Sequence, residues 1–279
     1  MMNIRTFLER MKKELSDIYE EREIRSISLK LLEEKFGILR QDIYINPEYI
    51  LDEKIVDDFL EQLIKNKPVQ YILGYEWFMG MKFNVNENVL IPRPESEELV
   101  MWIIEDIKNN KNINILDIGT GSGCIAVSLA KRLFPAEVTA VDISEEALEI
   151  AARNAAENKV KVKFYRKDII SETINGSFDI IVSNPPYVTD SEKIFMRKNV
   201  LDYEPKSALF VDDNNPLLFY RRISEISKNN LKKGGRLFFE INQHYGKAIV
   251  QMLEDMWYFG IVLKKDIFDK DRMVKAVWK

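Results

Sequence analysis

The chain has 279 residues, 46% hydrophobic and 31% charged, a composition typical of a globular protein with room for two domains. Its net charge of −4 gives no general attraction to nucleic acid or to an anionic membrane. A single cysteine, Cys124, and a single histidine, His244, exclude a disulfide framework and a Cys/His metal cluster, and leave only His244 to assist a Ser or Cys nucleophile.

Residues 1–75 are predicted to form a small helical domain. Apolar residues recur there at three- and four-residue spacing, the pattern of helices that bury one face. The three stripes are Ile4, Phe7, Leu8, Met11, Leu15 and Ile18; Ile24, Ile27, Leu31 and Leu32; and Ile55, Val56, Phe59, Leu60, Leu63 and Ile64. Gly37 is a suitable C-cap for the second helix, and Asp52 is a suitable N-cap for the third.

The amino terminus is charged throughout, unlike a signal peptide. The chain also lacks any run of about 18 apolar residues, the length that a membrane span requires. We therefore expect a cytoplasmic protein with no membrane segment.

Residues 76–92 are predicted to be a linker that forms a β-hairpin, since Met81, Phe83 and Val85 alternate after Gly80. The block Ile91-Pro92-Arg93-Pro94-Glu95-Ser96-Glu97 follows and leads into a helix with an apolar face. Acidic residues suit the start of that helix, but helix capping does not explain an arginine between two prolines.

Residues 93–279 are predicted to form an α/β domain. Strands and helices alternate from residue 112 onward, which favours βαβ units and a parallel sheet. The expected strands are Ile113–Ile118, Val138–Val141, Val162–Tyr165, the run that begins at Phe178, and Arg236–Glu240. Ile261–Lys265 and Met273–Trp278 should close the sheet as an antiparallel pair, and Leu201–Tyr220 should form a lid or substrate wall.

The fourth strand ends in Asn184-Pro185-Pro186-Tyr187, a sequence that cannot continue a ladder. The two prolines lack donors and fix their own φ angles, so the turn is stiff. Ligands bind at this end of strands in open α/β sheets. Stiff acceptors beside the Tyr187 ring suit a planar NH2 group, although a turn that merely ends a strand would have similar residues.

A second group of residues describes an adenosine site. Gly119, Thr120, Gly121, Ser122 and Gly123 form a G-x-G-x-G loop after the first strand, which differs from the dinucleotide fingerprint and the P-loop. Asp142 ends the second strand, where it can accept both ribose hydroxyls. Asp168 can accept from an adenine amino group, with Ile169 against the ring. S-adenosylmethionine fits this set better than NAD does. Asp117 either organises the loop or contacts the ligand.

The chain resembles the protein-(glutamine-N5) methyltransferases that modify peptide chain release factors, the HemK/PrmC family. The Asn-Pro-Pro-Tyr motif alone is shared with methyltransferases of DNA adenine and ribosomal RNA, whereas the Ile-Pro-Arg-Pro-Glu block with a helical amino-terminal domain is more specific. The matching blocks are residues 68–74, 91–97, 117–126, 184–187, 203–205, 208–209 and 271–272.

The resemblance implies a Rossmann-like class I S-adenosylmethionine-dependent methyltransferase domain behind a helical domain that recognises the substrate. The substrate would be the glutamine side-chain amide in the Gly-Gly-Gln loop of class 1 release factors. By resemblance, Gly119–Gly123, Asp142 and Asn184 bind the cofactor, and Asn184, Pro185, Pro186 and Tyr187 bind the glutamine. Two departures stand out: Ile169 replaces a frequent aromatic residue, and Asn242 replaces the glycine that usually follows Glu240-Ile241.

We expect catalysis by positioning, without a metal or a strong base. Asn184 and Pro185 would accept the two amide hydrogens, and Tyr187 would cover the planar amide. Two alternatives stay open: a methyltransferase for an exocyclic amino group of a base in RNA or DNA, which the charge of −4 disfavours, and a binding module without activity. A monomer without direct nucleic-acid contacts is expected.

Overall fold

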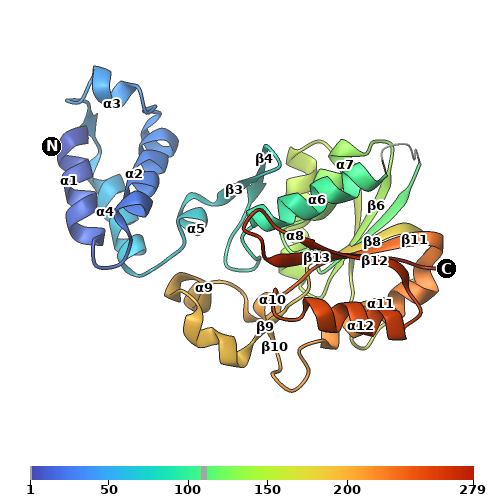
Figure 1. Cartoon of the computed structure of the whole chain (residues 1–279). Helices are drawn as coiled ribbons and strands as arrows, with labels where there is room; N and C mark the ends of the chain where they lie inside the picture. Colours follow the sequence, from blue (N-terminus) through green and yellow to red (C-terminus); the bar gives the residue numbers. More distant parts are fainter. Residues whose placement is uncertain (1, 108–111) are drawn as a thin grey trace. The chain divides into compact units, whose positions relative to one another are not determined.

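The computed structural model describes residues 2–107 and 112–279 (Figure 1). The chain divides into two compact units, and the first combines two separate stretches of sequence. Unit 1 comprises Met1–Gly74 and Arg197–Tyr203, and unit 2 comprises Tyr75–Met196 and Glu204–Lys279. Within the described residues, we find no helix with both the length and the apolar character needed to cross a bilayer.

Unit 1 is helical around a core of Leu, Ile, Phe and Met side chains. Its helices are α1 (Ile4–Leu15), α2 (Glu21–Phe36), α3 (Asp42–Ile45), α4 (Glu53–Ile64), α5 (Val69–Leu73) and α9 (Lys198–Tyr203). A short antiparallel pair joins β1 (Met2–Asn3) to β2 (Ile50–Leu51). The predicted caps are confirmed: Gly37 ends α2 at φ 67°, and the Asp52 side chain accepts from Lys54 N–H at the start of α4. Ile18, Ile55 and Ile64 are exposed, so the predicted stripes are wider than the buried ones.

The segment Arg197–Tyr203 joins unit 1 through polar contacts with residues far away in the sequence. Arg197 Nη1 lies 3.0 Å from a Glu23 carboxylate oxygen of α2, and Tyr203 Oη donates to the Lys65 carbonyl at 2.8 Å. The helical unit is therefore completed by a segment from within residues 93–279, where the sequence indicated no boundary.

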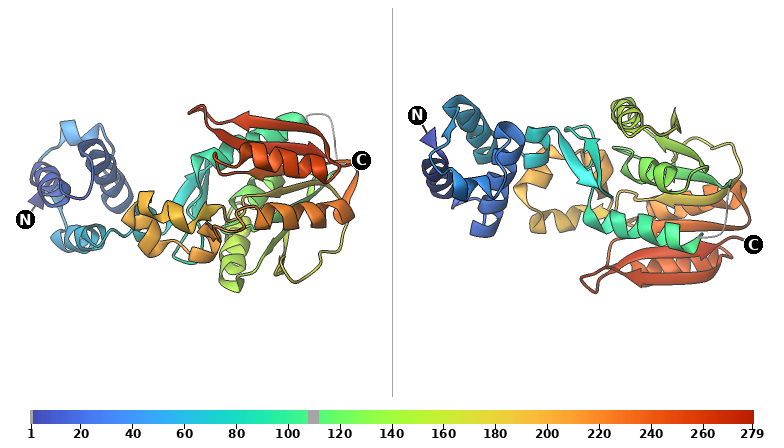
Figure 2. Two further views of the ribbon diagram at one scale, coloured as in Figure 1. Left: turned by 60° about the horizontal axis from the view of Figure 1, so that its bottom comes forward. Right: turned by 90° about the horizontal axis from the view of Figure 1, so that it is seen from above.

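Unit 2 contains a seven-stranded sheet in the order β12-β13-β11-β8-β5-β6-β7. The strands are β5 (Asn114–Ile118), β6 (Glu137–Asp142), β7 (Val162–Arg166), β8 (Phe178–Ser183), β11 (Leu231–Glu240), β12 (Phe259–Lys265) and β13 (Asp271–Val277). β13 runs antiparallel to both of its neighbours, β11 and β12, as predicted for the tail, and the other neighbouring strands are parallel. Figure 2 shows the β12–β13 pair in red at one edge. These features confirm the predicted Rossmann-like methyltransferase fold.

Helices cover both faces of this sheet (Figure 1). One face packs against α6 (Pro94–Asp106), α7 (Cys124–Arg132) and α8 (Glu145–Glu157), and the other packs against α11 (Leu218–Asn230) and α12 (Gly246–Asp255). Because β8 lies in the middle, Ile180, Ile181 and Val182 are fully buried. The apolar run before the Asn-Pro-Pro-Tyr turn is thus explained by burial on both faces.

Helices α11 and α12 were not predicted from the sequence. Neither begins with a capping side chain: Leu217 and Tyr245 occupy the N-cap positions and make no side-chain cap hydrogen bond. Both helices owe their stability to the apolar face that they bury against the sheet, since Ile223 and Ile249 are fully buried.

Short elements complete unit 2. The hairpin β3 (Tyr75–Phe78) and β4 (Met81–Asn84) precedes α6, and a 3-10 helix η1 (Asp190–Phe195) follows β8. Strand β9 (Val188–Thr189) pairs in parallel with β10 (Phe210–Val211), which follows α10 (Lys206–Leu209). This pairing holds the segment after Glu204 against the turn that follows β8.

Candidate active site

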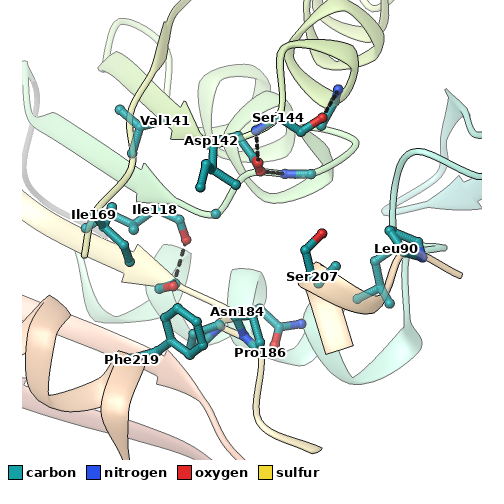
Figure 3. Close-up of a pocket in the computed structure, with 18 of the residues that line it drawn as sticks. Leu90, Ile118, Val141, Asp142, Ser144, Ile169, Asn184, Pro186, Ser207 and Phe219 are labelled. Atoms are coloured by element: carbon teal, nitrogen blue, oxygen red, sulfur yellow. Dashed lines mark hydrogen bonds between the residues drawn. The ribbon is translucent and has the colours of Figure 1, made fainter. Parts of the chain in front are cut away.

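A cavity of about 320 Å³ opens at the carboxyl ends of β5, β6 and β8. The order of the strands reverses here, since β5, β6 and β7 follow one another to one side while β8 lies on the other, and α/β sheets bind ligands at such a point. In the view of Figure 3, Asp142 and Ser144 lie above the cavity, and Asn184 and Pro186 lie below it. The lining also includes Leu90, Ile118, Gly119, Gly121, Val141, Lys167, Asp168, Ile169, Pro185, Pro205, Ser207, Ala208, Phe210 and Phe219.

The loop after β5 brings backbone to the cavity wall. Gly119 and Gly121 line the cavity at φ 74° and 53°, and a Cβ atom on either would point into open space. Gly123 has a different role, because its Cβ would lie 3.0 Å from Cβ of Ala151; this glycine allows α7 to start close to α8. Thr120, Ser122 and Gly123 do not line the cavity.

Asp117, at the end of β5, is buried and accepts from Thr120 Oγ1 at 2.7 Å. Burial raises the pKa of Asp117 to about 7, partly offset by the hydrogen bond from Thr120. Asp117 is absent from the cavity wall, so its contacts fit the loop-organising role.

Asp142 ties the ends of β5 and β6 together. Its Oδ2 accepts from Gly121 N–H at 2.8 Å, and its Oδ1 accepts from Ser144 N–H at 3.1 Å. Burial raises the pKa of Asp142, and these backbone hydrogen bonds oppose that rise. A carboxylate oxygen has two lone pairs, so each oxygen can still accept one ligand hydroxyl.

Asp168 and Ile169 lie on the cavity wall after β7. The Asp168 carboxylate accepts from Ser171 Oγ at 2.6 Å and from Ile170 N–H at 2.9 Å, and these bonds lower its pKa. Arg222 of α11 donates to the Ile169 carbonyl at 2.7 Å. The Ile169 backbone is thus held in place, and its side chain packs against the core as an apolar part of the wall.

The turn after β8 places Asn184, Pro185 and Pro186 on the cavity wall. Ser183 Oγ donates to the Ile118 carbonyl at 2.6 Å, which fixes the end of β8 to the end of β5. Asn184 Nδ2 donates to Ser96 Oγ at 3.3 Å. Tyr187 does not line this cavity; its hydroxyl donates to Glu240 Oε1 at 3.3 Å, and its ring packs against the core beneath α11 and α12.

Two residues of this site, Ser96 and Glu240, were not among the predicted site residues. Ser96 lies in the first turn of α6 and donates to Glu240 Oε2 at 2.5 Å; Glu240 ends β11. The available signals were the position of Ser96 in the Pro-Arg-Pro-Glu-Ser block and of Glu240 at the carboxyl end of a central strand.

Comparison with known proteins decides the family. The model of the methyltransferase small domain matches residues 100–202. A release factor glutamine methyltransferase of Flavobacterium psychrophilum is 49% identical over 99% of this chain and 99% of that protein. One from Bacteroides thetaiotaomicron is 48% identical over 95% of this chain and 97% of that protein. The chain belongs to the release factor glutamine methyltransferases.

Solved structures share the fold of this methyltransferase at low sequence identity. A methyltransferase from Pyrococcus furiosus has a TM-score of 0.53 and 20% identity, covering 79% of this chain and 98% of that one. A T. thermophilus 16S rRNA methyltransferase, solved in complex with AdoMet and guanosine, has a TM-score of 0.52 and 18% identity, covering 74% of this chain and 50% of that one. Both support the fold alone.

The arginine between two prolines has a structural explanation in this methyltransferase. Arg93 Nη2 pairs with Glu204 Oε1 at 2.5 Å, and Glu204 Oε2 accepts from Ile91 N–H at 3.3 Å. Glu204 is buried and precedes Pro205, Ser207 and Ala208, which line the cavity. Arg93 thus fixes the part of the expected Leu201–Tyr220 wall that follows Glu204.

Replacing Arg93 with alanine should destabilise unit 2 by about 1–3 kcal/mol, because it leaves a buried carboxylate without its cation. Urea unfolding measures this loss. Arg153→Ala is the matched control: its pair with Glu157 is exposed, and its loss should cost less than about 1 kcal/mol. Equal effects for the two variants would contradict the anchoring role of Arg93.

The described residues contain no group of three or more His, Cys, Asp or Glu side chains arranged to hold a metal ion.

Proposed function

We propose that this chain transfers a methyl group from S-adenosylmethionine to the side-chain amide nitrogen of the glutamine in the Gly-Gly-Gln loop of class 1 peptide chain release factors. The observation that carries the proposal is the stiff pair of acceptors, Asn184 and Pro185, on the wall of a cavity that also presents Asp142 and the glycine loop. The family gives the reaction, and this geometry gives residues that can perform it.

The cavity suits the proposed cofactor. Gly119 and Gly121 offer backbone without side chains, Asp142 retains acceptor capacity for two ribose hydroxyls, and Ile169 supplies an apolar surface for adenine, with Asp168 beside it. S-adenosylmethionine supplies an electrophilic methyl group on a positively charged sulfur. We assign Thr120, Ser122 and Gly123 a supporting role behind this surface, since they shape the loop without lining the cavity.

The proposed chemistry of the protein is positioning. If Asn184 Oδ1 and the Pro185 carbonyl accept the two amide hydrogens, the nitrogen lone pair points toward the methyl group for in-line displacement. Fixing both reactants in this way can contribute about 7–11 kcal/mol to lowering a barrier in the best cases. His244 lines a separate hollow with Tyr187, and the lysine on the cavity wall, Lys167, pairs with Glu172 at 2.8 Å. Neither offers a free base beside Asn184. That Tyr187 and Pro186 help to hold the glutamine stays a prediction.

The competing function, methylation of an exocyclic amino group in RNA or DNA, would use the same acceptors. The names of the relatives do not favour it. The net charge of −4 also gives no general attraction to a phosphate backbone.

Methyl transfer tests the proposal directly. Purified protein and labelled S-adenosylmethionine are incubated with a class 1 release factor, with RNA or with DNA, and mass spectrometry locates the methyl group. We expect label on the loop glutamine of the release factor alone. Label on nucleic acid, or no transfer to the release factor, would refute the proposal.

Because the substrate acts in translation, we also propose that the protein works in the cytoplasm.

We further propose that the helical unit recognises the release factor. Tyr44 and Ile45 of α3 are 74% and 77% exposed, an unusual display of apolar surface on a small unit. Tyr44→Ser with Ile45→Ser should raise the KM for intact release factor about tenfold, with kcat and cofactor Kd unchanged, because the loss of two apolar anchors weakens docking alone. Trp257→Asn, at a residue of unit 2 that is 77% exposed, is the control. Unchanged KM in the double variant would remove α3 from the docking surface.

A further inference from the structure

A buried polar chain connects Asn184 to Glu240. Asn184 Nδ2 donates to Ser96 Oγ at 3.3 Å, and Ser96 Oγ donates to Glu240 Oε2 at 2.5 Å. Ser96 is 3% exposed and Glu240 is 1% exposed, so water does not compete for the bond between them, and the bond from Asn184 to Ser96 is partly buried. These two hydrogen bonds link the turn after β8, the first turn of α6 and the end of β11, which meet behind the cavity.

When Glu240 is ionised, its carboxylate sets the direction of both hydrogen bonds, from Asn184 to Ser96 and from Ser96 to Glu240. A carboxylate only accepts, so the single proton of Ser96 Oγ is directed at Glu240. Ser96 Oγ can then only accept from Asn184, which must present its NH2 group. The side-chain oxygen of Asn184 is therefore available to a ligand in the cavity. Within residues 2–107 and 112–279, no protein N–H or O–H group donates a hydrogen bond to it.

We propose that Ser96 and Glu240 are positioning residues that hold the Asn184 amide with its oxygen available to the substrate. This inference rests on the proposed function, in which the substrate amide donates its hydrogens to Asn184. An Asn184 side chain rotated by half a turn about its Cβ–Cγ bond occupies the same volume but presents its NH2 group to the cavity in place of its oxygen. That orientation would oppose the NH2 of a bound glutamine and prevent the proposed alignment.

The protonation state of Glu240 should therefore control the rate of turnover. A protonated Glu240 can donate to Ser96, whose proton can then turn to Asn184 and favour the rotated amide. Burial raises the pKa of Glu240; Arg272 of β13 and the hydroxyls of Ser96 and Tyr187 lower it, and Glu95 of α6 raises it. Because the enzyme with ionised Glu240 is the active form, kcat should reach its full value at pH values above the raised pKa of Glu240. It should be lost as the pH falls through it.

The test compares single-turnover methylation of a release factor by the full-length wild type, Ser96→Ala and Glu240→Gln, at saturating cofactor and over a range of pH. We expect Ser96→Ala to lower the rate about tenfold or more, the size typical of losing one preorganised polar contact, with cofactor Kd within twofold of wild type. Glu240→Gln should lower the rate and remove the decline at acid pH, because its amide has no proton to gain.

Ser128→Ala is the matched control, since Ser128 is a fully buried helix serine on α7 and makes no hydrogen bond to Asn184 or Glu240 among the described residues. Thermal unfolding is measured for every variant. A wild-type rate in folded Ser96→Ala, or an acid limb that persists in Glu240→Gln, would overturn the inference. If Ser96→Ala does not fold, the pH profile of Glu240→Gln decides. A wild-type protein that fails to methylate the release factor would instead refute the proposed function.

Discussion

Replacing Asn184 with alanine should lower kcat by about 10²-fold or more, while the affinity for the release factor changes little. The lost acceptor acts mainly in the transition state, where it aligns the amide nitrogen, so its removal affects turnover more than binding. A hundredfold loss corresponds to about 2.7 kcal/mol, a size measured for single preorganised contacts at other active sites. Single-turnover rates and thermal unfolding are measured on the same preparation.

Asn184→Asp is the discriminating variant. It keeps an acceptor oxygen for the substrate but loses the NH2 that donates to Ser96 Oγ. We expect weak residual activity with aspartate and almost none with alanine. If folded Asn184→Ala binds cofactor and methylates at nearly the wild-type rate, the central assignment of the site is wrong.

Asp142→Ala should weaken S-adenosylmethionine binding by about 10²-fold, with the sheet intact. Two hydrogen bonds from ribose hydroxyls to a carboxylate are worth about 1.5–3 kcal/mol each before coupling. Because Asp142 is largely buried, solvent screens these bonds only weakly. Asp142 also accepts from Gly121 and Ser144, so part of the loss will come from a looser glycine loop. Calorimetric titration of the full-length protein gives the dissociation constant.

Asp168→Ala is the control for Asp142. Asp168 lines the same cavity, but its carboxylate is exposed and is held by Ser171 and Ile170 of its own turn. We expect a smaller loss of affinity than for Asp142→Ala. Equal losses would mean that the Asp142 carboxylate contributes no more to cofactor binding than the exposed Asp168 carboxylate on the same wall.

Features that depend on local chemistry could be predicted from the amino-acid sequence alone. The Asn-Pro-Pro-Tyr turn, the glycine loop and Asp142 each follow an apolar strand, and parallel strands align their carboxyl ends at one edge of a sheet. Their meeting around one cavity therefore followed from periodicity and chain order. Gly37 and Asp52 could likewise be assigned as caps, since a cap depends on its immediate neighbours.

Contacts between residues far apart in the chain could be identified only in the folded protein. Ser96 meets Glu240 across 144 positions, and Arg93 meets Glu204 across 111. Such pairs are set by the register of the sheet and by the angle at which α6 packs on it, which no local pattern encodes. The same holds for the segment Arg197–Tyr203, which completes the helical unit, and for Tyr187, whose hydroxyl turns to a buried carboxylate. Local sequence thus specified the reactive turn, while distant packing set the orientation of its asparagine.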